Sequence, residues 1–268
     1  MPELPEVETI AKELREKIVN EVFSNVESIW VRSFTQEKGL TLTNRRIIAI
    51  DRRGKYLIFN LDKYYLVIHL RMTGQLIVGA SKPSRDRYLR LVFKFKSGKY
   101  LLFYDLRKFG RIYLTQNPEN VLKNVGVDAI SEVFTADKFS EMLNGKKSKI
   151  KSFLLDQKNI AGLGNIYIDE SLFEARIHPE TVINSLDDGQ KNKLFTAIRK
   201  ILFDAIDNMG TTISDYKTTG GGFGDHQEYL KVYQRQNQPC IICDSIIEKI
   251  KLNGRGTHFC PQCQKKIT

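Results

Sequence analysis

The sequence predicts an α+β protein of two domains, a β-sandwich or barrel led by a helix and a helical domain that ends in a cysteine module. Three observations support this fold class. Short runs rich in Ile, Val, Tyr and Phe, separated by turn signals, fill residues 45–115 and are typical of a sandwich or barrel. Helical spacing of apolar residues replaces them from residue 117. All four cysteines lie after residue 239, and the change from strands to helices places a domain boundary near 115–135.

The first helix is expected over Glu6–Val19, where apolar residues recur at helical spacing. Pro5 suits a first helical turn, and the carboxylate of Glu6 suits the positive end of the helix dipole. Six strands should follow: Arg45–Asp51, Lys55–Leu61, Tyr64–Leu70, Tyr88–Lys96, Tyr100–Asp105 and Arg111–Thr115. Five helical segments come next: Pro118–Lys123, Ala136–Leu143, Ile150–Asp156, Ile166–Ala175 and Leu186–Asn208. The Gly-rich stretch at 218–226 is expected to be a mobile loop.

Charge and hydropathy restrict the partners. The chain has 42 Lys and Arg against 31 Asp and Glu, a net charge of +11. This excess favours a polyanionic partner, nucleic acid first and an anionic membrane second, although a protein that is simply basic is an equal alternative. Apolar runs fall short of the ~20 residues that span a bilayer, and no leader precedes the first helix. We therefore expect a cytosolic protein that does not enter membranes.

The cysteine module contains two C-x-x-C pairs, Cys240 with Cys243 and Cys260 with Cys263. This spacing predicts a structural zinc site with four thiolate ligands. Two disulfides are the alternative, which a cytosolic compartment disfavours. Asn253-Gly254 between the pairs predicts a tight hairpin turn. Arg255 would then project from its tip and clamp phosphates, unless it is only a solvated turn residue.

Two further patterns suit DNA. Asn165 follows two glycines at a helix start, where N–H groups bind phosphate oxygens, although a plain helix–helix turn has the same pattern. The stretches at 69–74 and 105–110 each end a strand with a basic residue, a bulky apolar residue and a glycine. On loop tips, Met72 and Phe109 would be wedges that unstack bases; otherwise they are core residues.

The first residues suggest chemistry at the chain terminus. If Met1 is removed, Pro2 carries a terminal secondary amine. An average α-amine, with a pKa near 8, is about 10% neutral at pH 7, against about 0.04% for a lysine, and the advantage stays large for the somewhat more basic proline amine. Such an amine can attack the anomeric carbon of a deoxynucleotide, and loss of the base leaves a cationic iminium that promotes strand elimination. Glu3 could shuttle protons beside it. The alternative is that Pro and Glu merely begin a helix.

Taken together, these stretches resemble the bacterial formamidopyrimidine-DNA glycosylase family over essentially the whole chain. The matching segments are MPELPEVET at the start, RRGKYL at 52–57, HLRMTG at 69–74, DLRKFGR at 105–111, GLGNIYIDESLF at 162–173 and the cysteine module. The resemblance implies an N-terminal β-sandwich catalytic domain at 1–125, a helix–two-turn–helix DNA-binding domain at 126–230 and a zinc-finger hairpin at 231–268. It also implies removal of oxidised purines (8-oxoguanine and formamidopyrimidines) followed by AP-lyase β,δ-elimination.

The resemblance also implies the roles of individual residues. Pro2 would be the Schiff-base nucleophile and Glu3 the general acid and base, supported by Glu6. Lys55 would contact the target phosphate and assist elimination. The residues that bind phosphates would be His69, Asn165 and Arg255. The residues that fill the gap left by the extruded nucleotide would be Met72, Arg107 and Phe109. The Lys217–His226 loop would cover the flipped base, with Lys217 among the DNA-binding residues.

Two other functions fit part of the pattern. A non-catalytic zinc-containing DNA-binding protein has no need of Pro2 beside Glu3. An endonuclease VIII-like enzyme would share both residues but usually opens PEGPE, whereas this chain opens PELPE and so resembles the purine branch. Lys108 and Leu106 stand where other members often carry arginine and proline. The expected partner is double-stranded DNA with oxidised purines or abasic sites, bound by a monomer in the bacterial cytoplasm at the nucleoid.

Overall fold

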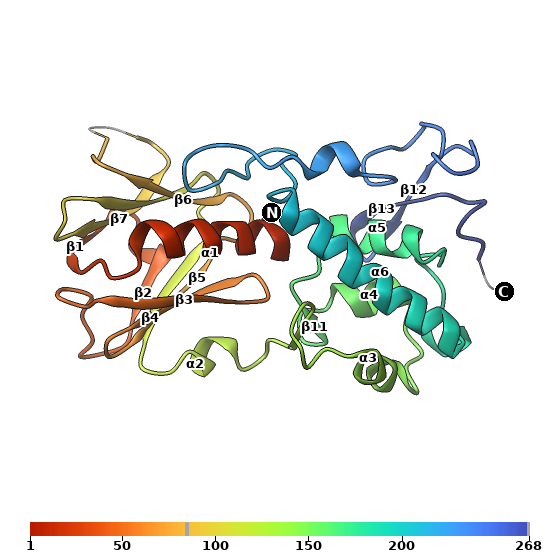
Figure 1. The fold of residues 1–268 in the computed structure, drawn as a ribbon, viewed down its shortest axis with the longest axis horizontal. Coiled ribbons are helices and arrows are strands. Elements are labelled where there is room, and N and C mark those ends of the chain that lie inside the picture. Colours follow the sequence, from red (N-terminus) through yellow and green to blue (C-terminus); the bar gives the residue numbers. More distant parts are fainter. Residues whose placement is uncertain (84–85, 267–268) are drawn as a thin grey trace. The chain divides into compact units, whose positions relative to one another are not determined.

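The structure is a computed structural model that describes residues 1–83 and 86–266 (Figure 1). It divides into two compact units. The N-terminal unit comprises residues 1–124 and 206–227, and the C-terminal unit comprises residues 125–205 and the chain from Glu228 onward. The fold class predicted from the sequence, a β-sandwich with a leading helix followed by helices and a cysteine-bearing hairpin, is confirmed.

Helix α1 (Leu4–Ile18) begins two residues earlier than expected. The cause is a capping box, in which the backbone N–H of Glu3 donates to Oε2 of Glu6 at 2.6 Å. This bond brings Leu4 and Pro5 into the first turn. The apolar face of α1 packs against β3 (Ile47–Arg53) and joins the core of the sandwich, so the start of the chain is fixed to a rigid body (Figure 1).

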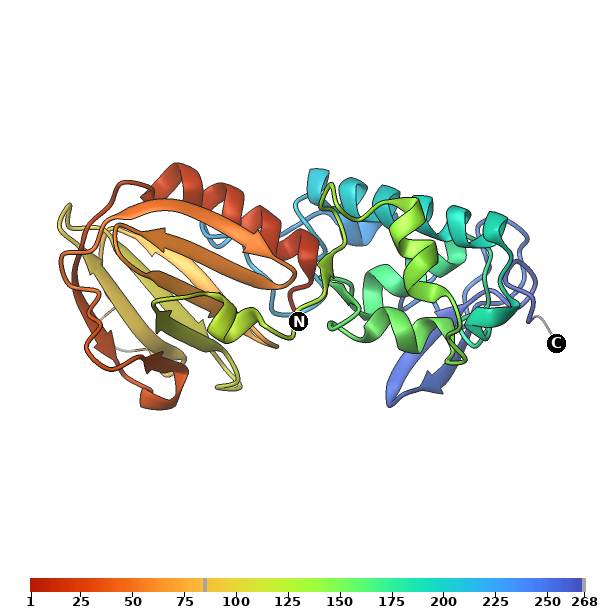
Figure 2. The ribbon, with the colours of Figure 1, turned by 90° about the horizontal axis from the view of Figure 1, so that it is seen from below.

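The sandwich consists of two sheets, which Figure 2 shows as separate layers. The four-stranded sheet has the order β1-β7-β8-β6, all antiparallel: β1 (Phe23–Ser28), β7 (Leu89–Phe95), β8 (Tyr100–Asp105) and β6 (Gly74–Gly79). The five-stranded sheet has the order β2-β9-β5-β4-β3: β2 (Phe34–Gln36), β9 (Arg111–Thr115), β5 (Tyr65–His69), β4 (Tyr56–Leu61) and β3. Only the pairing of β2 with β9 is parallel within these two sheets of the described chain. Apolar side chains of both sheets fill the space between them.

All six predicted strands are present, but β1, β2 and β6 were not predicted from the sequence. β1 (FSNVES) is an edge strand with mostly polar residues, and β2 has only three residues. β6 (GQLIVG) is bounded by two glycines, Gly74 and Gly79. Edge position and glycine ends both weaken the local signal for a strand.

The five predicted helical segments are also present. They are α2 (Glu119–Leu122), α3 (Ala136–Leu143), α4 (Ile150–Leu155), α5 (Asn165–Glu174) and α6 (Asp188–Asp207). The remaining elements are the 3₁₀ turns η1 (Val31–Ser33), η2 (Ile183–Ser185) and η3 (His226–Tyr229), the short parallel pair β10 (Val127–Asp128) and β11 (Ile160–Ala161), and the hairpin β12 (Glu248–Leu252) with β13 (Arg255–Phe259). Within the described ranges, no helix has the length and apolarity needed to cross a bilayer.

The segment 206–227 groups with the N-terminal unit rather than with the helices that precede it. Its anchors are side chains of α1. Oε1 of Glu6 accepts the Thr211 N–H at 2.8 Å, and Oε2 of Glu13 accepts the Thr219 N–H at 2.7 Å. The predicted helical domain at 126–230 includes this segment, whereas the compact units place it with the sandwich. The bonds responsible join residues about 200 positions apart, which no local sequence pattern connects. The three-domain division stays a prediction.

Candidate active site

The chain terminus lies at the capped start of α1. Met1 is 42% exposed, whereas Pro2 is buried and Glu3 is only 3% exposed. Glu6 holds this terminus in place, because one carboxylate oxygen accepts the Glu3 N–H and the other accepts the Thr211 N–H. A β-carbon on Gly210 would approach Oε1 of Glu6 to 2.8 Å, so a glycine is required there. The first residues are thus held as a rigid group in which an exposed Met1 precedes a buried Pro2-Glu3 pair.

Lys55 and His69 belong to neighbouring parts of the five-stranded sheet. Lys55 follows Gly54 (φ 57°) in the tight β3–β4 turn and is buried. His69 ends β5 opposite Tyr56, and the two ring centroids lie 4.4 Å apart in an edge-on arrangement. The structure therefore places two predicted phosphate-binding residues at the same end of the sheet.

The environment of His69 fixes its protonation state. Burial, followed by the positive charges of Arg71 and Lys55, lowers the pKa of His69 to about 3. Its Nδ1 accepts the backbone N–H of Arg71 at 2.9 Å. The neutral ring therefore carries its proton on Nε2, which makes His69 a neutral hydrogen-bond donor suited to a phosphate oxygen.

The two strand-end loops carry the predicted void-filling residues. Met72 is half-buried, whereas Arg107 is exposed and Phe109 is 47% exposed. The guanidinium carbon of Arg107 lies 5.0 Å from the centroid of the Phe109 ring, within cation–π range. An exposed phenylalanine next to an arginine argues against the core interpretation of Phe109.

The segment that contains Lys217 covers a cavity of about 540 Å³ in the N-terminal unit. Tyr216 anchors the segment in the sandwich core, and its hydroxyl donates to the Met209 carbonyl at 3.0 Å. The cavity is lined by residues of the sheet and of this segment: Thr73, Gln75, Ile77, Asp86, Tyr88, Tyr104, Leu106, Ser214, Asp215, Lys217 and Gly221. Tyr88 and Tyr104 were not predicted, because a tyrosine in a turn or on the outer face of a strand carries no signal of a cavity on its own.

In the C-terminal unit, Asn165 and Arg255 come together at the hairpin. Asn165 is the first residue of α5, and its Nδ2 donates to the Gly256 carbonyl at 2.9 Å. Arg255 opens β13 and is exposed. Asn253 fixes the turn from the other side, since its Nδ2 donates to the Ser152 hydroxyl at 2.5 Å. Asn165 therefore also holds the hairpin, a role that the sequence did not predict.

A buried ionic cluster is hydrogen-bonded to strand β13 of this hairpin. Nζ of Lys151 lies 2.6 Å from Oδ1 of Asp169 and 2.8 Å from Oγ1 of Thr257, and the side chains of Lys151 and Asp169 are fully buried. Oδ2 of Asp169 accepts the backbone N–H of His258 at 2.9 Å. These bonds join α4 and α5 to β13. Helix periodicity predicted the helices but gave no sign of the cluster, because its members lie far apart in sequence.

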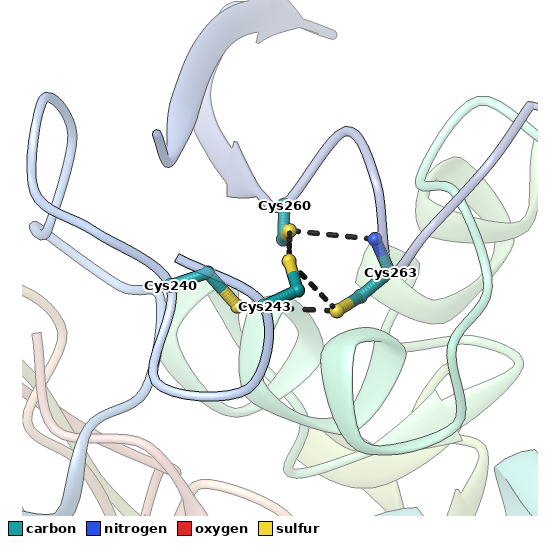
Figure 3. Close-up of side chains that lie close together, drawn as sticks. All are labelled: Cys240, Cys243, Cys260 and Cys263. Atoms are coloured by element: carbon teal, nitrogen blue, oxygen red, sulfur yellow. Dashed lines mark hydrogen bonds between the residues drawn. The ribbon is translucent and has the colours of Figure 1, made fainter. Parts of the chain in front are cut away.

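The four cysteines converge on one point (Figure 3). Their sulfur atoms all lie within 4.8 Å of one another, with separations of 3.9 Å (Cys240–Cys263), 3.4 Å (Cys243–Cys260) and 3.5 Å (Cys243–Cys263). These separations exceed a disulfide bond of about 2.05 Å. They are close to the ~3.8 Å edge of a tetrahedron of thiolates around a zinc ion with Zn–S bonds of about 2.3 Å. The donor set fits zinc, and the disulfide alternative is wrong.

Comparison with known proteins agrees with this geometry. Family models match the chain in three segments: the formamidopyrimidine-DNA glycosylase N-terminal domain at residues 1–112, the H2TH domain of the same family at 125–217, and a zinc finger found in FPG and IleRS at 237–266. The formamidopyrimidine-DNA glycosylase of Pelotomaculum thermopropionicum is 40% identical, with 99% of each chain covered. That of Listeria innocua is 39% identical over 99% of this chain and 100% of its own. The chain belongs to the formamidopyrimidine-DNA glycosylase family.

Solved structures of this family have the same fold. The chain matches a mutant of the Lactococcus lactis family member in complex with Fapy-dG containing DNA, with a TM-score of 0.92, 39% identity and coverage of 99% of this chain and 100% of that chain. It also matches the L. lactis protein bound to an abasic site containing DNA, with a TM-score of 0.91, 38% identity and coverage of 98% and 100%. A third match, to the wild-type L. lactis protein with an oxidized pyrimidine containing DNA, has a TM-score of 0.91, 39% identity and coverage of 99% and 100%.

The family assignment completes the interpretation of the cysteine module. Residues 237–266 are a zinc finger, and the ligands of the single ion are Cys240, Cys243, Cys260 and Cys263. Four thiolates close the tetrahedral coordination, so this ion supplies no open position for chemistry. Zinc instead joins the two C-x-x-C turns on either side of the β12–β13 hairpin, and this hairpin carries Arg255.

Proposed function

We propose that the chain removes oxidised purines from duplex DNA and then cleaves the strand at the resulting abasic site. The family to which it belongs performs base-excision repair as a bifunctional glycosylase and AP lyase. The observation that carries the proposal is the buried Pro2-Glu3 pair at the rigid, capped start of α1. A protein that only bound DNA would have no use for an amine precursor and a carboxylate in such a position.

The proposed reaction begins when removal of Met1 frees the nitrogen of Pro2. The neutral secondary amine attacks C1′ of the damaged nucleotide, and the bond from C1′ to the base breaks. Glu3 protonates the sugar ring oxygen, and the bond from C1′ to that oxygen breaks so that the ring opens. The proton that the attacking amine loses ends on the departed base as the cationic iminium forms. The iminium acidifies the C2′ protons, and loss of one expels the 3′ phosphate. A second elimination expels the 5′ phosphate, and water then releases the sugar remnant and restores Pro2.

Each unit contributes its own phosphate-binding residues to the proposed complex. In the N-terminal unit, Lys55 supplies a charge and the neutral Nε2–H of His69 supplies a donor. In the C-terminal unit, Asn165 is bonded to the carbonyl of Gly256, next to Arg255, in the hairpin of the zinc finger. Phosphate contacts of this kind set the register of a duplex without reading its sequence.

The extruded base and the gap that it leaves require separate residues. We assign the base to the cavity beneath the segment that contains Lys217, where Tyr88 and Tyr104 offer ring faces and Gln75 offers an amide. The gap in the duplex would be filled by Met72, Arg107 and Phe109; Met72 is half-buried, and the exposure of Arg107 and Phe109 suits wedges. The active species is proposed to be a monomer, associated with the nucleoid through DNA.

Two substrate classes are supported to different degrees. The L. lactis family member has been solved with Fapy-dG containing DNA, with an abasic site and with an oxidized pyrimidine. We propose oxidised purines and abasic sites as the main substrates, in agreement with the PELPE opening. Oxidised pyrimidines are the second candidate class.

A cleavage assay on single-lesion duplexes tests this function. We expect the chain to cut a duplex with one 8-oxoguanine opposite cytosine and to leave phosphates on both sides of the gap, as β,δ-elimination requires. A duplex with an oxidised pyrimidine should be cut more slowly, and the undamaged duplex should stay intact. Equal cleavage of all three, or cleavage of none, would contradict the proposal.

Replacing Arg255 with alanine is expected to weaken binding to DNA and to flatten its salt dependence. Loss of one phosphate contact should reduce the slope of log K against log salt by about 0.9. Lys138→Ala is the matched control, because Lys138 is an exposed cation of α3 that forms an ion pair with Glu141 of the same helix. Fluorescence anisotropy across a salt series measures both slopes. The same slope for Arg255→Ala and the wild type would remove Arg255 from the phosphate contacts.

A further inference from the structure

The two loops that carry the proposed void-filling residues are one hydrogen-bonded unit. We call residues 70–73 and 106–110 the paired loops. They follow β5 and β8, and Gly74 at the start of β6 pairs in register with Asp105 at the end of β8. The side chain of Asp105 is bonded to both loops. It is 1% exposed.

The carboxylate of Asp105 accepts three hydrogen bonds from the paired loops. Oδ1 accepts the hydroxyl of Thr73 at 2.5 Å and the backbone N–H of Arg107 at 3.2 Å. Oδ2 accepts the backbone N–H of Gly110 at 2.7 Å. The Thr73 hydroxyl is itself an acceptor, for the Arg107 N–H at 3.0 Å. Thr73 therefore bridges the loop of Met72 to the loop of Arg107 and Phe109.

Both loops have a backbone that needs such support. Arg71 and Lys108 have φ values of 56° and 60°, in the left-handed region that side chains other than glycine disfavour. Such residues persist where surrounding contacts fix them, and they cluster at functional sites. Lys108 is further held by the ring of Trp30, with Nζ 4.3 Å from the ring centroid.

Other contacts prevent the end of β8 from moving. The buried side chain of Arg90 donates Nε–H to the Asp105 carbonyl at 2.8 Å. A β-carbon on Gly110 would approach the ring of Phe103 to 2.4 Å, so the second loop lies directly against the sandwich core. The paired loops are thus rigid at their bases, while Arg107 and Phe109 are exposed at the tips.

We propose that Thr73 and Asp105 are positioning residues that fix Met72, Arg107 and Phe109 in the geometry needed to enter the duplex when the damaged nucleotide leaves it. This inference rests on the proposed function. A wedge must compensate for lost base stacking, and a loop that had to become ordered on insertion would lose conformational entropy as well. Because the hydrogen bonds of Thr73 and Asp105 already join the two loops, this conformational entropy is not lost on insertion.

Removal of the bridge should affect base extrusion more than the later chemistry. Thr73→Val keeps the branched shape but deletes the hydroxyl, and Thr73→Ser keeps the hydroxyl. For a duplex with 8-oxoguanine opposite cytosine, we expect single-turnover excision by Thr73→Val to fall about ten-fold, as for one lost hydrogen bond to a charged group. Thr73→Ser should stay within about two-fold of the wild type. Cleavage of a preformed abasic site should change less than about two-fold in both variants, because no base has to be unstacked.

A fluorescent base reports on the wedge directly. With 2-aminopurine next to the lesion, Thr73→Val should show a slower fluorescence rise than the wild type, and Thr73→Ser should restore it. Equal excision by Thr73→Val and the wild type would overturn the inference, as would equal losses in both variants. A fall in abasic-site cleavage as large as the fall in excision would indicate general structural damage and would overturn it too. If the wild type cuts neither substrate, the proposed function itself fails.

Discussion

Pro2→Gly is expected to lower base excision by on the order of a thousand-fold or more, the usual scale for loss of a nucleophile. Glycine leaves a primary amine, which forms an imine that is cationic only when it gains a proton. The secondary amine of proline yields an iminium with a permanent charge. Glycine also loses the ring that fixes the buried terminus before α1. Single-turnover excision of 8-oxoguanine measures the effect.

An extended N-terminus provides the matched control for this variant. An added residue before Pro2 puts its nitrogen into a peptide bond but leaves the ring unchanged. The structure shows that such a residue fits, because Met1 precedes Pro2 as an exposed residue while the bond between Glu3 and Glu6 is intact. The extended chain should fold and bind DNA but fail to form a borohydride-trapped adduct. Trapping equal to that of the native chain would exclude Pro2 as the nucleophile.

Glu3→Gln is expected to bind damaged DNA normally and to excise the base about 10²- to 10⁴-fold more slowly, as for loss of a general acid. Glutamine keeps the size of the side chain and accepts hydrogen bonds, so the helix start should be retained. It cannot transfer a proton to the sugar ring oxygen. The measurement is the dissociation constant for a duplex with an uncleavable abasic analogue, set against the rate of excision.

Glu16→Gln is the control for this substitution, because Glu16 is an exposed residue of the same helix. It should leave both binding and excision unchanged. Excision by Glu3→Gln at the wild-type rate would contradict the proposed proton transfer. A parallel loss of binding would show instead that Glu3 holds the terminus.

Features of the fold that depend on local pattern were predicted from the sequence. α1, α3 and α6 were found near their expected ranges because each has apolar residues at helical spacing. β6 was missed because its two terminal glycines give the signal of a turn. The position of the segment 206–227 was missed because it depends on Glu6 and Glu13, which lie about 200 residues earlier.

In the candidate site, too, features made by residues close in sequence were predictable and those made by distant residues were not. Pro2 with Glu3, and the two C-x-x-C pairs, were predictable because their chemistry needs residues that are adjacent or nearly adjacent in sequence. The bridge between Thr73 and Asp105 spans 32 residues, and the bond between Lys151 and Thr257 spans 106. Each of these polar residues is common in its own segment. Only the folded chain shows that they meet and that burial makes their bonds specific.

In the proposed reaction, the nitrogen of Pro2 forms the covalent bond to DNA. Borohydride reduction during reaction with an 8-oxoguanine duplex, followed by digestion and mass spectrometry of the adduct, tests it most directly. We expect a deoxyribose remnant on an N-terminal peptide that begins at Pro2, with Met1 absent. A remnant on Lys55 or another lysine, or a trapped chain that retains Met1, would contradict it.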